Sequence, residues 1–143
     1  MARRRQIKLR AVFLDSSVLF TAVNSPFGGS AKLFTLPNFH LFTSPVVLTE
    51  VERNVRKKLS SFQLDRFFIL VGKIIILSQL PDKKLIAKAK KTTVEKDAVI
   101  LAEVKKAKMD LVTLDKKHLL TNQVEKFLKP KSVFTPKEIL EKV

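Results

Sequence analysis

The sequence has no cysteine, which excludes disulfide bonds, thiol catalysis and zinc sites built from thiolates. Nothing in it points to an oxidising compartment, and we expect a cytoplasmic protein. Long apolar runs are also missing. The apolar stretch behind the basic start is interrupted by Arg10 and Asp15 and lacks a small-residue cleavage site, so we expect neither a signal peptide nor contact with a membrane.

Acidic residues are scarce: 28 Lys and Arg face 13 Asp and Glu, which gives a formal net charge of +15. Such a charge attracts polyanions, above all nucleic acid. The alternative is a lysine-rich surface of the heat-stable type, although such surfaces usually match Lys with Glu. Candidate contacts to a nucleic-acid backbone are Lys57, Lys58, Lys116 and Lys117, with further lysines at 83–84 and 88–91.

Tyrosine and tryptophan are absent, while the eleven phenylalanines lie mostly inside apolar runs. We therefore assign the phenylalanines to the core rather than to a platform on which bases stack. With 143 residues, 45% of them hydrophobic, the chain is long enough for one core. We expect a single domain over residues 1–143, with residues 1–10 as a basic N-terminal arm.

Apolar runs typical of strands alternate with stretches typical of helices. The expected strands are 11–14, 40–43, 74–77, 110–115 and 133–134, and the expected helices are 18–23, 31–36, 45–59, 64–72, 83–91, 93–108 and 136–143. Ser30 and Ser44 are expected N-caps, and Thr92 and Thr135 begin capping-box patterns. The alternation predicts a three-layer α/β/α fold with a central, largely parallel sheet of four to five strands.

Four acids stand out by their placement. Asp15 and Asp115 each end an apolar strand, and the carboxyl ends of parallel strands meet at one edge of a sheet, where α/β proteins hold their ligands. Asp97 lies on the core-facing stripe of its helix, close to the helix start, and Glu50 lies beside the stripe of another helix. We therefore expect these carboxylates to converge.

Carboxylates held close together repel one another unless a cation lies between them. Oxygen ligands, without cysteine and with only two histidines, suit Mg²⁺ or Mn²⁺. Such ions in a basic cleft support hydrolysis of a phosphodiester. We thus identify Asp15, Glu50, Asp97 and Asp115 as the candidate catalytic and metal-binding residues, and expect Ser17 and Thr113 to hold carboxylate oxygens in place.

Each residue also has a simpler reading. A strand-end aspartate is often a turn residue or a helix cap. Taken alone, Asp97 could simply interact with the helix dipole, and Glu50 could be a solvated surface acid. His40 and His118 are assigned to structural or surface positions. The convergence of all four acids carries the metal hypothesis.

These stretches resemble the PIN domain family of nucleases, which includes the toxins of virulence-associated toxin–antitoxin pairs. The strand and Asp-x-x start at 12–19, the helix at 44–51 and the block at 97–102 with 107–115 resemble the parts that supply the family's four acids. The segments 25–30 and 135–140 are similar to one subgroup of toxin components. The resemblance covers nearly the whole chain.

The resemblance implies a compact α/β/α domain, dependence on Mg²⁺ or Mn²⁺, and cleavage of single-stranded RNA by an endoribonuclease. It also implies a homodimer and, for toxins, a protein antitoxin that blocks the site. Two departures stand out. Ser17 replaces the usual asparagine, which we expect to loosen the shell around Asp15, and Lys117 stands where many members carry a further aspartate, which we expect to weaken a second metal.

Of three alternatives, the first remains open and the sequence argues against the other two. A catalytically weak or inactive PIN-like module would bind RNA as a clamp within RNA processing. A phosphoacceptor receiver domain shares the layers and the acidic edge, but it needs adjacent acids after the first strand, where Ser16 and Ser17 stand. A phosphatase of the haloacid dehalogenase type would need an acid at Ser17.

Overall fold

The computed structural model describes residues 9–143, so residues 1–8 of the expected basic arm lie outside the described part. Five strands form one sheet in the order β3-β2-β1-β4-β5, and every pairing is parallel. The strands are β1 Arg10–Leu14, β2 Phe39–Thr43, β3 Ile75–Ile76, β4 Asp110–Val112 and β5 Val133–Phe134. The predicted parallel α/β sheet is confirmed.

The centre of the sheet is buried on both faces. Val12, Phe13 and Leu14 of β1 have no exposed surface, as expected for an unbroken apolar strand between two helical layers. β1 pairs on one side with β2, with Val12 opposite Leu41, and on the other side with β4, with Leu14 opposite Val112. The run that the sequence marks as most apolar is therefore the middle of the fold.

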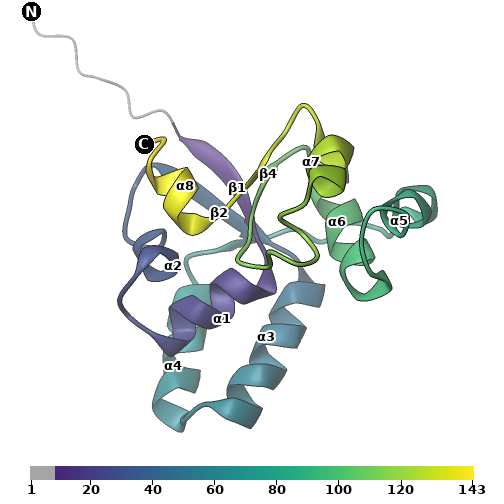
Figure 1. Cartoon of the computed structure of the whole chain (residues 1–143). Coiled ribbons are helices and arrows are strands. Elements are labelled where there is room, and N and C mark those ends of the chain that lie inside the picture. Colours follow the sequence, from purple (N-terminus) through teal and green to yellow (C-terminus); the bar gives the residue numbers. More distant parts are fainter. Residues whose placement is uncertain (1–8) are drawn as a thin grey trace, which may run out of the picture.

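Helices cover both faces of the sheet. They are α1 Ser16–Asn24, α2 Gly29–Lys32, α3 Pro45–Lys58, α4 Ser61–Val71, α5 Lys83–Ala89, α6 Glu95–Ala107, α7 Asn122–Leu128 and α8 Pro136–Leu140. α1, α3 and α4 contact one another and form one group, whereas α6 contacts α5 and α7 across the sheet from it (Figure 1). Within residues 9–143, none of these helices has the length and apolar character needed to cross a membrane.

The α3 helix follows its sequence signals closely. The Ser44 hydroxyl accepts a hydrogen bond from the backbone N–H of Val47 at 3.4 Å, and Pro45 occupies the first turn. Val51 and Val55 are fully buried at helical spacing. This anchoring fixes the rotation of α3 and, with it, the direction in which Glu50 extends.

Four helix starts differ from the prediction, and the first is α1, which begins at Ser16 rather than at residue 18. Thr92 does not cap α6: its hydroxyl donates to the carbonyl of Ala89 at 2.9 Å and closes the turn after α5, so Val94 takes the N-cap position. Ser30 lies inside α2, which begins after Gly28. Gly28 has a φ of 93°, a backbone conformation that glycine adopts more readily than other residues. α4 begins earlier than expected because Ser60 and Gln63 form a capping box.

The strand order reverses between β1 and β4, which places their carboxyl ends at a switch point where α/β folds open a crevice. β4 ends at Val112, earlier than the predicted Asp115. The backbone N–H of Asp115 donates to the Thr113 hydroxyl at 3.1 Å, and this bond turns the chain out of the strand. Asp15 and Asp115 thus emerge side by side at the crevice.

Candidate active site

A pocket of about 260 Å³ opens at this switch point. All four acids singled out in the sequence line it, and they come from the ends of β1 and β4 and from α3 and α6. Its lining consists of Asp15, Ser16, Ser17, Phe20, Glu50, Asn54, Val94, Lys96, Asp97, Asp115 and His118. The fold therefore brings into one pocket acids that lie as far apart in the sequence as positions 15 and 115.

Asp15 is held rigidly, with only 3% of its surface exposed. Its Oδ2 accepts hydrogen bonds from the hydroxyls of Ser17 and Thr113, both at 2.8 Å. These hydroxyls in turn accept the backbone N–H groups of Leu114, at 3.0 Å, and Asp115, at 3.1 Å. Because each hydroxyl oxygen accepts an N–H group, the hydroxyl is polarised and donates a stronger hydrogen bond to the Asp15 carboxylate.

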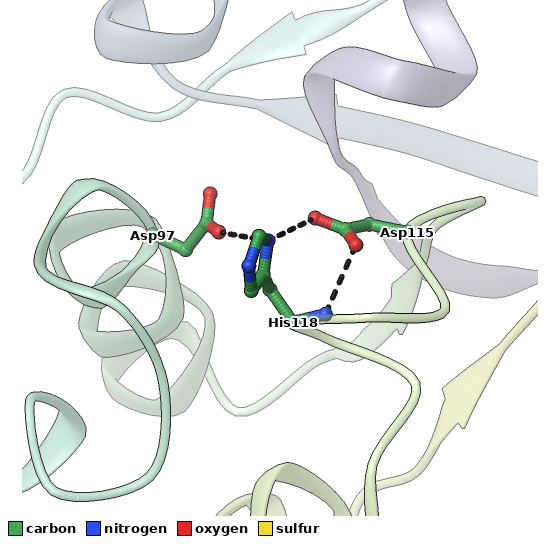
Figure 2. Close-up of side chains that lie close together, drawn as sticks. All are labelled: Asp97, Asp115 and His118. Atoms are coloured by element: carbon green, nitrogen blue, oxygen red, sulfur yellow. Dashed lines mark hydrogen bonds and ion pairs between the residues drawn. The ribbon is translucent and has the colours of Figure 1, made fainter.

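Asp115 is fixed by the turn that it begins. Its Oδ1 accepts the backbone N–H groups of Lys117 at 3.1 Å and His118 at 3.0 Å. The second oxygen, Oδ2, lies 3.3 Å from Nδ1 of His118 (Figure 2). One oxygen therefore anchors the side chain, and the other extends toward the pocket.

Asp97 lies in the first turn of α6, where a carboxylate also interacts favourably with the helix dipole. Its side chain is only 13% exposed, and its Oδ2 is 3.7 Å from Nδ1 of His118. Burial, followed by the nearby charges of Asp15 and Asp115, raises the pKa of Asp97, while His118 and Lys96 act in the opposite direction. Burial and the neighbouring carboxylates thus disfavour the ionised form of Asp97.

Glu50 reaches the pocket from α3, with 22% of its side chain exposed. Its Oε1 lies 3.3 Å from Nζ of Lys96, the residue that precedes Asp97 on α6. The ion pair ties α3 to α6 across the mouth of the pocket, and the exposed ammonium contributes little energy by itself. Lys96 is a basic residue of the pocket that the sequence analysis did not single out.

His118 is a second pocket residue that sequence reasoning missed, because we assigned it to a structural or surface position. Its ring stands between the carboxylates of Asp97 and Asp115 (Figure 2). The sequence feature that could have identified His118 is its position three residues after the strand-end Asp115, on the turn that Asp115 begins.

The predicted lysine contacts fall into two groups. Lys116 and Lys117 are exposed and directly follow Asp115, beside the pocket. Lys57 and Lys58 are exposed at the far end of α3 and do not line the pocket. Lys57 lies seven positions after Glu50 on the helix, which is about 10 Å along the axis.

The residues present fit a divalent metal ion. Asp97, Asp115 and His118 offer donor atoms that all lie within 4.8 Å of one another. Asp15 and Glu50 line the same pocket outside this closest group. Burial, and after it repulsion from Asp15 and Asp115, raises the pKa of Asp97, and a cation among the carboxylates would relieve that repulsion. Oxygen ligands suit Mg²⁺ or Mn²⁺.

Comparison with known proteins agrees with this fold. The toxin–antitoxin complex VapBC2 from Rickettsia felis, solved with a DNA fragment from its promoter, has a TM-score of 0.68 at 15% identity, covering 87% of this chain and 98% of that one. VapBC-1 from nontypeable Haemophilus influenzae has a TM-score of 0.64 at 13% identity, covering 89% and 98%.

VapC20 from Mycobacterium tuberculosis, a toxin that cleaves the sarcin–ricin loop, has a TM-score of 0.55 at 15% identity, covering 74% of this chain and 91% of that one. These likenesses establish the fold. No curated protein sequence matches the chain. The sequence does match the PIN domain family over residues 12–122. The chain therefore belongs to the PIN domain family, a family of nucleases.

Proposed function

We propose that this protein is a metal-dependent endoribonuclease that hydrolyses phosphodiester bonds of single-stranded RNA. The observation that carries the proposal is the convergence of Asp15, Asp97 and Asp115 on one pocket in a chain of net charge +15. A carboxylate-lined pocket in a positively charged protein suits a cation that bridges the protein to a phosphate. The cytoplasm is its proposed location.

We assign the metal-binding role to Asp15, Glu50, Asp97 and Asp115, with Mg²⁺ or Mn²⁺ as the ion. Bound there, the ion would polarise the phosphodiester, lower the pKa of an attacking water and neutralise the leaving oxygen. Ser17 and Thr113 support this role because they hold Asp15 Oδ2 through two hydrogen bonds of 2.8 Å. Ser17, at the position of the family's usual asparagine, makes one of these two hydrogen bonds.

Glu50 is our candidate for orienting the attacking water. It enters from a different layer than the strand-end aspartates and keeps part of its side chain exposed to solvent. In the proposed step the water oxygen forms a bond to phosphorus, Glu50 takes a proton from the water, the bond from phosphorus to the leaving oxygen breaks, and the leaving oxygen takes a proton from solvent. Lys116 and Lys117 are placed to neutralise flanking phosphates without reading the base sequence.

A second candidate is a PIN-like RNA-binding module with little or no cleavage activity, and the net charge of +15 favours it equally. A cleavage assay on single-stranded RNA with and without Mn²⁺ separates the two. We expect Asp97→Asn to abolish cleavage while Asp65→Asn, the same change on the exposed face of α4, retains it. Metal-independent degradation, or intact RNA with the parent protein despite binding, would refute the nuclease proposal.

We also propose that the protein is the toxin of a toxin–antitoxin pair and has a protein antitoxin as its partner. The similar structures from Rickettsia felis and Haemophilus influenzae are VapBC complexes. In this chain α4 exposes Phe62, Phe68 and Ile69, and exposed apolar side chains of this size suit a protein partner. A homodimer is the proposed oligomeric state, which light scattering of the purified chain tests.

A further inference from the structure

We infer that His118 is a nitrogen ligand of the metal site, and that it makes the site prefer a first-row transition ion such as Mn²⁺ over Mg²⁺. The inference rests on the proposed function and specifies which ion the site takes. It follows from the position of the ring, its anchoring and its chemistry.

The ring nitrogen lies where a shared ligand would lie. Nδ1 of His118 is 3.3 Å from Oδ2 of Asp115 and 3.7 Å from Oδ2 of Asp97. An ion that binds its ligands at about 2.1 Å keeps neighbouring donor atoms about 3.0–3.4 Å apart, whether the arrangement is octahedral or tetrahedral. The separation from Asp115 falls in this range and the separation from Asp97 is slightly longer, and the donor atoms of the three residues all lie within 4.8 Å of one another (Figure 2). A closer approach of Asp97 would complete a three-ligand set.

The backbone under the ring is held from two sides. The N–H of His118 donates to Oδ1 of Asp115 at 3.0 Å, and its carbonyl accepts the Thr93 hydroxyl at 2.8 Å. Thr93 belongs to the segment that leads into α6, which carries Asp97. This pair of hydrogen bonds therefore joins His118 to Asp115 and to the segment before α6, and limits the entropy lost on binding an ion.

Imidazole changes which ion the pocket prefers. Mg²⁺ favours oxygen ligands and keeps several of its waters, whereas imidazole suits transition ions. The carboxylates of Asp97 and Asp115 can bind either Mg²⁺ or a transition ion, so the nitrogen of His118 is the donor that discriminates between these two classes of ion. The alternative is that the imidazolium of His118 merely neutralises the two carboxylates and competes with a metal.

The test measures metal binding to the full chain without RNA. Calorimetry gives the affinities for Mn²⁺ and Mg²⁺, and pulsed electron paramagnetic resonance of bound Mn²⁺ detects a coordinated ¹⁴N nucleus. We expect a ¹⁴N signal that His118→Ala removes, together with a fall in Mn²⁺ affinity of at least about tenfold and a change in Mg²⁺ affinity below about threefold. His40→Ala is the matched control, because His40 is exposed on β2 and remote from the pocket lining.

Three outcomes would overturn the inference. The parent protein could bind Mn²⁺ without ¹⁴N coupling, His118→Ala could weaken both metals equally, or it could strengthen binding as expected from loss of a competing cation. In each of these cases both metals still bind, so the nuclease proposal stands. If the parent protein binds neither metal, the inference and the metal dependence fail together.

Discussion

The hydroxyl of Thr113 gives the sharpest energetic prediction. Thr113 is fully buried, donates to the Asp15 carboxylate at 2.8 Å and accepts the N–H of Asp115 at 3.1 Å. Thr113→Val keeps the shape of the side chain but removes both hydrogen bonds. A bond to a charged group contributes about 1.5–3 kcal/mol, and the N–H left without a partner adds about 1 kcal/mol, so we expect a loss of about 2.5–4 kcal/mol.

The chain offers a close control in Thr43, which is also fully buried and donates to the carbonyl of Leu14 at 2.9 Å. Thr43→Val makes the same chemical change, but the acceptor that it leaves is neutral. We expect this variant to lose about 0.5–1.5 kcal/mol. The difference between the two variants isolates the effect of the carboxylate.

Urea unfolding in the presence of EDTA measures both losses. Because the chain has no Tyr or Trp, circular dichroism is the suitable probe. A double-mutant cycle that combines Thr113→Val with Asp15→Asn should give a coupling energy of at least about 1 kcal/mol. Equal losses at Thr113 and Thr43, or a coupling energy below about 0.3 kcal/mol, would refute the reasoning that hydroxyls clamp a charged Asp15.

Three further predictions concern charge. Burial and the neighbouring carboxylates raise the pKa of Asp97, so the stability of the metal-free protein falls as pH rises from the ordinary value of 3.8 through the raised folded pKa. Asp97→Asn should remove this fall and raise the Tm at pH 7 in EDTA, and an unchanged Tm would contradict this. Mn²⁺ at a hundred times its Kd should stabilise the parent by about 2.7 kcal/mol in thermal scans, and the gain should be absent in Asp97→Asn. Replacing Lys116 and Lys117 by Gln should reduce the slope of log K against log salt for single-stranded RNA by about 1.4, and the same change at Lys57 and Lys58 should reduce it less.

The sheet and most of the acidic pocket could be predicted because they depend on simple periodicity. An unbroken apolar run that ends in a carboxylate, as at Asp15 and near Asp115, combines strand burial with the rule that parallel strands end at one edge. Asp97 and Glu50 followed from their positions on helices that pack against the core. To predict the positions of these four residues, it was enough to know which side chains of each strand or helix face the core.

Other features depended on competition between neighbouring groups, which the sequence pattern does not resolve. Thr92 has a cap signature, but its hydroxyl bonds to the preceding turn instead. His118 enters the pocket only because Asp115 accepts its backbone N–H and redirects the chain. Lys57 and Lys58 form a basic pair in the sequence, yet the rise of α3 carries them away from Glu50.

The most direct test of the account is an anomalous diffraction map from crystals of the protein soaked in Mn²⁺. We predict a peak in the pocket at the ends of β1 and β4, within about 2.2 Å of oxygens from Asp97 and Asp115, with Asp15 bound directly or through one water. A peak elsewhere, or an empty pocket at saturating Mn²⁺, would contradict the claim that these carboxylates form a metal-dependent nuclease centre.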